Sequence, residues 1–190
     1  TRDELRDLIE QELERQGPDA DLNHIDTSQI TDMSEMFYRL NIGNIKIDDW
    51  DVSNVTNMNR MFNVCTHFNC DLSNWNVSNV ENMFATFNGC TTFTGNGLEN
   101  WNVSNVGNMH DMFEYCDKFN GDLSSWNVSK VTNMQRMFSY CDEFNCDLSK
   151  WDVSNVENME SMFNYCKRFN ADISKWNTSN VTNMEYMLYG

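Results

Sequence analysis

The chain has 190 residues, 13 basic and 29 acidic, which gives a net charge of −16 at pH 7. This balance argues against nucleic acids and anionic membranes as partners, because both need Lys and Arg to neutralise phosphates. No apolar stretch approaches the roughly 18 residues of a membrane-spanning helix, and no signal peptide or lipidation motif is recognisable. We therefore expect no insertion into a membrane.

Residues 2–16 are predicted to form a helix. Thr1 and Glu4 have the spacing of a capping box, and Gly17-Pro18 would end the helix. One face carries apolar residues at helical spacing, and the other face is polar. The apolar residues are Leu5, Leu8, Ile9 and Leu13. We expect residues 1–24 to form an N-terminal helical cap over the first edge of the remaining fold.

The rest of the chain, residues 25–190, repeats with a period of 25 residues, and one repeat has 26. A period of this size predicts a solenoid of stacked units. Residues 25–49 form a degenerate repeat with Ile25 in the place of Trp, and a partial repeat begins at Trp176. The longer repeat carries its extra residue near 93–98, which predicts a bulge or a widened turn. Full repeats begin at Trp50, Trp75, Trp101, Trp126 and Trp151.

Two patterns within each repeat predict local structure. The segment Val-x-Asn-Met-x-x-Met-Phe-x-x-Cys has apolar residues on one side of a short α- or 3₁₀-helix. The segment Phe-Asn-x-Asp-Leu-Ser-x-Trp alternates by two, as a short strand does. We therefore predict an α/β repeat solenoid, in which short parallel strands stack from one repeat to the next.

The repeat resembles a known family. Trp-Asn-Val-Ser-Asn-Val-x-Asn-Met-x-x-Met-Phe-x-x-Cys-x-x-Phe-Asn-x-Asp-Leu-Ser is similar to the repeat of BspA-type leucine-rich repeat surface proteins of bacteria. The resemblance covers residues 25–190 and implies a right-handed stack like that of leucine-rich repeats. It also implies a cell-surface or extracellular location, and a role in adhesion to proteins or cells.

Seven cysteines are present, and five of them occupy one slot of the repeat. A residue kept at one slot in successive turns is typical of core packing, and free Cys behaves as a small buried apolar residue. The alternative is a disulfide within a repeat, joining Cys65 to Cys70 and Cys141 to Cys146. The pattern favours buried thiols.

Four aspartates also share one slot, and stacked carboxylates must be offset by something. Backbone N–H groups of the turns would suffice, and calcium between the repeats is the alternative. We expect no metal and no cofactor. The aspartates are Asp71, Asp122, Asp147 and Asp172. Asn-x-Ser/Thr triplets, which match glycosylation acceptors, are best explained as repeat consensus. They begin at Asn54, Asn76, Asn102, Asn127, Asn177 and Asn180.

Positions that differ between repeats are not dictated by packing, so they are expected to face solvent. Tyr115, Tyr140 and Tyr165 share one such slot in three successive repeats. An exposed row of Tyr rings would be suited to protein binding. The alternative is that the rings stack on one another and shield the cysteines. Basic residues at other variable positions complete the candidate partner-binding surface: Lys118, Arg136, Lys167 and Arg168.

The last repeat stops at Gly190 with no amphipathic segment after it. An uncovered edge of a repeat stack exposes apolar side chains and unpaired backbone groups. We expect that either more chain follows in the native protein or this end packs against a second copy. For the second case Met184, Met187 and Leu188 are candidate residues for end-to-end association, with a two-fold homodimer as the commonest closed arrangement.

Catalytic machinery is not recognisable. The three histidines fall at unrelated slots, and neither a phosphate-binding loop nor a nucleophile elbow is present. We expect a non-catalytic binding or adhesion module that presents one face to a protein partner. The alternatives are a structural spacer or segment of a longer array, and a calcium-dependent surface module.

Overall fold

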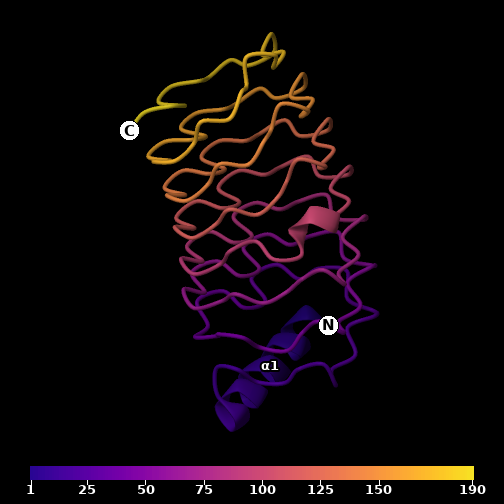
Figure 1. Ribbon diagram of the computed structural model, residues 1–190. Helices are drawn as coiled ribbons and strands as arrows, with labels where there is room; N and C mark the ends of the chain where they lie inside the picture. Colours follow the sequence, from indigo (N-terminus) through magenta and orange to yellow (C-terminus); the bar gives the residue numbers. More distant parts are fainter.

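The computed structural model describes residues 1–190 and consists of one helix followed by a stack of 25-residue turns of chain, here called coils (Figure 1). Helix α1 (Arg2–Gln16) lies at one end of the stack, and the C-terminus lies at the other (Figure 1). The only other helix is the 3₁₀-helix η1 (Leu98–Asn100). Successive coils thus follow the sequence period along one axis.

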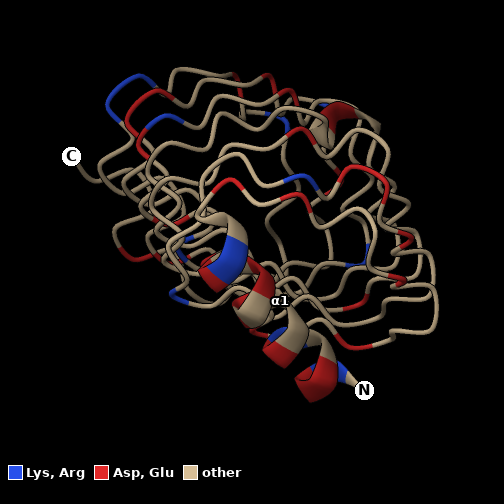
Figure 2. Ribbon diagram, turned by 90° about the horizontal axis from the view of Figure 1, so that it is seen from below, with Lys and Arg blue, Asp and Glu red and all other residues tan.

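Helix α1 agrees with the prediction for residues 2–16. The Thr1 side chain accepts the backbone N–H of Glu4 and the capping box is complete, while Gly17 ends the helix with a φ of 86°. Leu5 and Ile9 are buried, whereas Leu8 is 38% exposed. The helix crosses the open end of the stack (Figure 2). It therefore covers the apolar edge of the first coil.

The prediction of an α/β leucine-rich repeat solenoid is wrong. The coils contain no β-strand, and their only helix is η1. Adjacent coils share single isolated parallel bridges, such as Asn57 with Asn82 and Asn82 with Asn108. The expected strands of the Phe-Asn-x-Asp-Leu-Ser-x-Trp segment are turns and extended chain, and the expected short helices are consecutive β-turns. What remains of the prediction is the stacking of the repeats.

The β-turns arise from the backbone of the Met-x-x-Met-Phe-x-x-Cys part of each coil, here called the Met-Phe segment. Every second N–H donates within the coil to the third residue back, as from Met61 to the carbonyl of Met58 at 3.1 Å. Two residues of each segment have positive φ, which neither a helix nor a strand tolerates. In the first full coil these residues are Arg60 and Val64, with φ of 53° and 63°.

The remaining N–H groups of the Met-Phe segment connect one coil to the next, and the contact between two adjacent coils is here called a joint. Four of them, at alternate residues, donate to four carbonyls of the following coil at 2.7–3.0 Å. In one joint the pairs are Met58 to Asn82, Arg60 to Phe84, Phe62 to Thr86 and Val64 to Asn88. This row recurs at every joint of the stack. It satisfies buried backbone groups without forming a sheet.

Side chains of the core bond in the opposite direction, towards the preceding coil. The indole Nε1 of Trp126 donates to the carbonyl of Leu98 at 2.8 Å, and the thiol of Cys141 donates to the carbonyl of Phe113 at 2.9 Å. Every Trp and every Cys of the Met-Phe segments does the same with its own preceding coil. Trp and Cys are thus core residues that also tie the coils together.

Aromatic rings fill the axis of the stack. Phe62, Phe87, Phe113 and Phe138 are buried and stack with centroids 5.5–5.6 Å apart. The Trp rings form a second column, with centroids 6.4 Å apart between Trp50 and Trp75. Offset stacking at these distances adds to the hydrophobic gain of burial. One continuous core of 55 buried residues results, so no coil can be removed without exposing its neighbours.

The repeat of 26 residues accommodates its extra residue by a widened turn, which is one of the two alternatives that the sequence predicts. Gly95 and Gly97 have positive φ of 93° and 87°, and η1 follows directly. A Cβ on Gly97 would lie 2.2 Å from the backbone nitrogen of Ser73, so only glycine fits there.

Candidate functional site

The Tyr row, Tyr115, Tyr140 and Tyr165, lies on the surface of three successive coils. Its rings stack with centroids 4.8 Å and 5.0 Å apart and planes 19° apart. The rings therefore stack on one another, which agrees with the alternative to partner binding considered in the sequence analysis. Tyr115 is nevertheless 46% exposed and Tyr165 37% exposed. Tyr189 extends the row with an edge-on contact to Tyr165 at 5.6 Å.

The backbone of the Tyr row is in the left-handed region, with φ of 58°, 60° and 55°. The same slot is Gly89 in an earlier coil, with φ of 74°, and Val64 in the coil before that. A side chain in this conformation costs roughly 1–2 kcal/mol, whereas glycine has no such cost. The coil itself therefore does not require Tyr at this slot.

The predicted basic residues of this surface are mostly neutralised by the preceding or following coil. Lys167 contacts Asp142 at 2.6 Å, and Arg168 contacts Glu143 at 2.9 Å. Arg136 contacts Glu160 at 3.3 Å, and Lys118 makes no ion pair. The hydrogen bond to Asp142 raises the pKa of Lys167. The two charges of each of these three pairs offset each other, and the carboxylates of Glu114 and Asp111 lie near Tyr115 in addition.

Further polar groups lie beside the Tyr row; of these, His110 and Asp111 are at positions that differ between repeats and were expected to face solvent, but their side chains are only 24% and 15% exposed. Glu114 is partly buried and accepts a hydrogen bond from Asn88 at 2.9 Å; burial, and then the charge of Asp111, raise the pKa of Glu114. His110 contacts Asp111 at 2.9 Å. Five buried polar side-chain atoms of the Met-Phe segments have no hydrogen-bond partner. They belong to Asn59, His110, Asp111, Ser139 and Asn164, and the atoms of His110 and Asp111 are the two that face each other at 2.9 Å in the ion-pair contact above.

The predicted association residues lie in the last coil. Met184 is 40% exposed and Leu188 63% exposed, while Met187 is partly buried against the core. Tyr186 and Tyr189 add exposed rings at the same edge, at 63% and 56%. Because Tyr189 contacts Tyr165, the exposed residues of the last coil are continuous with the end of the Tyr row.

The aspartates of the shared slot are held by turns of their own. The Oδ1 atoms of Asp71, Asp122, Asp147 and Asp172 each accept the backbone N–H of the Ser two residues later, at 2.9–3.0 Å. Hydrogen bonds from that Ser lower the pKa of Asp122, Asp147 and Asp172. Turn N–H groups thus offset the carboxylates, which was the alternative to calcium. No group of three His, Cys, Asp or Glu side chains is arranged to hold a metal ion.

Most Asn of the Asn-x-Ser/Thr triplets are part of the same hydrogen-bond scheme. Asn76, Asn102, Asn127 and Asn177 accept a Ser N–H as the aspartates do. Asn54 and Asn180 donate to a Ser carbonyl of the preceding coil, at 2.8 Å and 2.6 Å. The recurrence of these Asn residues is therefore explained by the hydrogen bonds that they make within turns and between adjacent coils.

Acid should weaken the fold through these aspartates. Because the pKa values of Asp122, Asp147 and Asp172 are lowered from 3.8, the bonds stabilise the fold fully above pH 3.8, and their contribution is lost as the pH falls through the lowered values. We expect the melting temperature to fall on acidification from about pH 5 to about pH 2.5, followed by circular dichroism. A variant with all three changed to Asn keeps the turns, as Asn127 does, without titrating there. An equal acid-induced fall in that variant would contradict the assignment.

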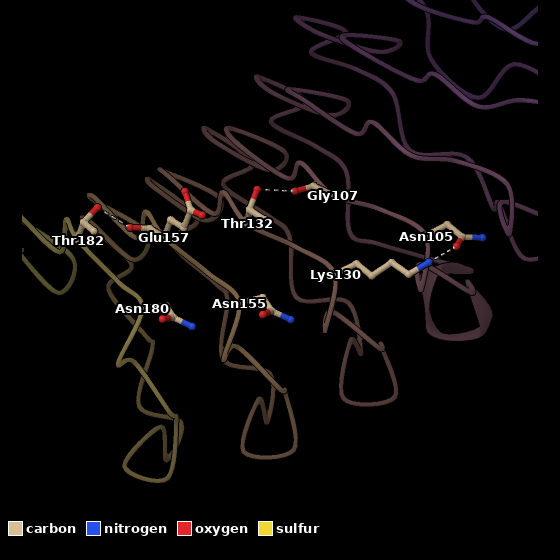
Figure 3. Close-up of a pocket in the computed structure, with 8 residues that line it drawn as sticks. All are labelled: Asn105, Gly107, Lys130, Thr132, Asn155, Glu157, Asn180 and Thr182. Atoms are coloured by element: carbon tan, nitrogen blue, oxygen red, sulfur yellow. Dashed lines mark hydrogen bonds between the residues drawn. The ribbon is translucent and has the colours of Figure 1, made fainter.

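A polar groove runs along another face of the stack, over four coils (Figure 3). Two parallel rows of side chains line its volume of about 730 Å³. One row is Asn105, Lys130, Asn155 and Asn180, and the other is Gly107, Thr132, Glu157 and Thr182. The Nζ of Lys130 donates to Oδ1 of Asn105 at 2.7 Å, in place of the Asn-to-Ser bond of the other coils. The signal in the sequence is that Lys130 and Glu157 depart from the consensus of their slots.

The cysteines agree with the prediction of buried thiols. All seven are free and buried, so neither Cys65 and Cys70 nor Cys141 and Cys146 are bridged. Burial raises the pKa of the Cys65, Cys70 and Cys166 thiols to about 12, and those of Cys90, Cys116 and Cys141 rise well above their ordinary value. Thiols of this kind are poor nucleophiles, so their role is packing and bonding between coils.

These features define a repeat protein whose coils stack through one recurring type of joint and whose variable residues are displayed on its surface. The chain belongs to the family described as "Mycoplasma protein of unknown function, DUF285", whose model matches residues 9–97 and 85–190. No curated protein matches the chain. None of its helices is long and apolar enough to cross a membrane.

Proposed function

We propose that this protein is a non-catalytic binding module of a cell surface or extracellular space, and that the Tyr row contacts a protein partner. The observation that carries the proposal is the Tyr row itself. Three residues adopt a left-handed backbone that Gly89 adopts more easily at the same slot, and two of their rings remain more than one-third exposed.

Stacking offsets part of the backbone cost but does not account for the choice of Tyr. Aromatic pairs contribute roughly 0.5–1.5 kcal/mol each, comparable with the cost of roughly 1–2 kcal/mol for each left-handed residue. The row thus brings little net stability, and Gly or Asn would be the ordinary choice at the third position of such a turn. A rigid, prestacked row of rings offers contact area with little entropy left to lose on binding.

The charges favour a protein partner over a polyanion. Glu114 and Asp111 lie near Tyr115 on a chain of net charge −16, so the charges favour a partner with a basic surface. Rings of the Tyr row could also accept Arg or Lys side chains of the partner on their faces.

The test is a pull-down from candidate surface and matrix proteins with the immobilised chain. A variant with Tyr115→Gly, Tyr140→Gly and Tyr165→Gly keeps a backbone that the fold accepts, and we expect it to lose at least about 10-fold in affinity for any partner retained by the native chain, as hot-spot aromatic residues do. Circular dichroism and thermal unfolding check that the variant is folded.

The matched control restores the repeat consensus in the polar groove. Lys130→Asn and Glu157→Thr place residues that other coils carry at those slots, so the fold should be unaffected. We expect this variant to bind as the native chain does. If it loses the partner while the Tyr variant keeps it, the groove is the binding surface; if neither native nor variant chains retain any candidate, a role as a structural spacer is favoured.

A further inference from the structure

The hydrogen-bond donors that line the polar groove are largely engaged within the stack. The side-chain amides of Asn105, Asn155 and Asn180 each donate to a Ser carbonyl of the preceding coil, at 2.6–2.7 Å. The hydroxyls of Thr132 and Thr182 donate to backbone carbonyls of the preceding coil, at 3.4 Å and 3.0 Å. The Asn and Thr side chains therefore offer a ligand mainly the lone pairs of their oxygen atoms.

The acceptors of the groove are free by contrast. Oδ1 of Asn155 and Oδ1 of Asn180 accept no hydrogen bond from the chain, and the carboxylate of Glu157 has neither a hydrogen bond nor an ion pair. Asn155 and Glu157 flank the buried Val156, and both of their side chains line the groove. A fitting ligand therefore donates hydrogen bonds and carries positive charge.

Lys130 shows which donor fits the row of Asn side chains. It replaces Asn in its coil, and its ammonium Nζ donates to Oδ1 of Asn105 at 2.7 Å (Figure 3). Asn155 has the same slot one coil beyond Lys130, and no ammonium donates to its Oδ1. An ammonium group of another molecule would find the same acceptor there, and the carboxylate of Glu157 in the facing row would offset its charge.

The spacing of the coils selects among ammonium ligands. Chains joined by backbone hydrogen bonds lie about 4.8 Å apart, so equivalent acceptors recur at that interval along the groove. Two nitrogen atoms separated by three methylene groups lie about 5 Å apart in an extended chain, given bond lengths of about 1.5 Å. Side chains on one face of an extended peptide recur at about 6.8 Å instead. A linear polyamine with a three-carbon spacer therefore matches the groove better than a Lys-rich peptide does.

We infer that the polar groove binds a linear polyamine. One ammonium group lies between Oδ1 of Asn155 and the carboxylate of Glu157, and the next lies against Oδ1 of Asn180 and Oγ1 of Thr182. The ammonium of Lys130 limits the site on its other side, because it repels a further cation. The net charge of −16 attracts a polycation from solution. This site lies apart from the Tyr row and does not depend on the proposed protein partner.

The test uses the full chain and spermidine, which has one three-carbon spacer. Calorimetric titration at low salt should give a Kd below about 1 mM, and NMR should show saturable shifts of the side-chain amides of Asn155 and Asn180. Glu157→Thr places the residue that the coils on both sides carry, and it should weaken binding about 5-fold by removing an exposed ion pair. Lys130→Asn should strengthen binding about 5-fold, because it removes a like charge and frees Oδ1 of Asn105.

The matched control is Asp152→Asn in the same coil. It removes one negative charge, as Glu157→Thr does, but Asp152 does not line the groove, and Asn127 and Asn177 have the new residue at that slot. We expect spermidine to bind this variant within about 2-fold of the native affinity. No saturable binding of spermidine to the native chain, or equal weakening by both substitutions, would overturn the inference. So would a Lys-rich peptide that binds through Glu157 where spermidine does not.

Discussion

Replacing Phe113 with Ala is expected to lower the free energy of unfolding by about 3–5 kcal/mol. The ring is fully buried, stacks between Phe87 and Phe138 with centroids 5.6 Å away, and contacts Phe119 at 4.0 Å. Its removal would leave a cavity in the middle of the aromatic column, where neighbours on both sides are fixed by stacking. Denaturant titration followed by tryptophan fluorescence and circular dichroism measures the loss.

The control for this variant lies at the same slot of the last coil. Leu188 is 63% exposed, so Leu188→Ala should change the unfolding free energy by less than about 0.5 kcal/mol. The two positions have the same place in the repeat and differ in burial. Similar losses for both would show that the column is not the main source of stability. Coincident transitions by both probes are needed, since stacked repeats can unfold in parts.

Gly97→Ala is the second substitution with a large expected effect, a loss of about 2–4 kcal/mol. The residue has a φ of 87°, and an added Cβ would lie 2.2 Å from the nitrogen of Ser73 and 2.7 Å from Oδ1 of Asp71. Both the backbone conformation and the space therefore exclude a side chain. Thermal unfolding of the variant beside the native chain gives the measurement.

Gly107 provides the comparison. A Cβ at Gly107 meets nothing within 4 Å, and its φ is not positive. Gly107→Ala should therefore leave stability unchanged or raise it by up to about 1 kcal/mol, by restricting the unfolded chain. A destabilisation of Gly107→Ala equal to that of Gly97→Ala would mean that the widened turn is not the strained point of the stack.

The sequence predicted the features that depend on side-chain type and spacing. The period, helix α1, the buried thiols and the widened turn near Gly97 follow from apolar spacing, capping residues and glycine. The secondary structure within a coil did not follow. Apolar residues at intervals of three and four are shared by a helix and by consecutive β-turns, and only backbone handedness separates the two.

The left-handed backbone could not be read from the sequence, because most residues with positive φ in this chain are not Gly or Asn, the types that usually adopt it. Arg136 and Tyr140 adopt it in the same coil, and among the corresponding slots of the full coils only Gly89 gives a hint. The polar groove was missed for another reason. Lys130 and Glu157 line it together although 27 positions separate them in the chain, and alignment of the repeats places them in neighbouring rows rather than in contact. The Tyr row was found because its residues share one slot.

The bonds between coils have a consequence for how the chain acquires its structure. The bonds of the Met-Phe segments, such as that from Phe113 to the carbonyl of Met137, join residues about one period apart in the sequence, wherever the coil lies in the stack. The entropy of closing such loops is thus nearly the same at each step and does not grow with the number of coils. Folding can begin at any adjacent pair and spread by adding neighbours, so the rate-limiting event is the first joint.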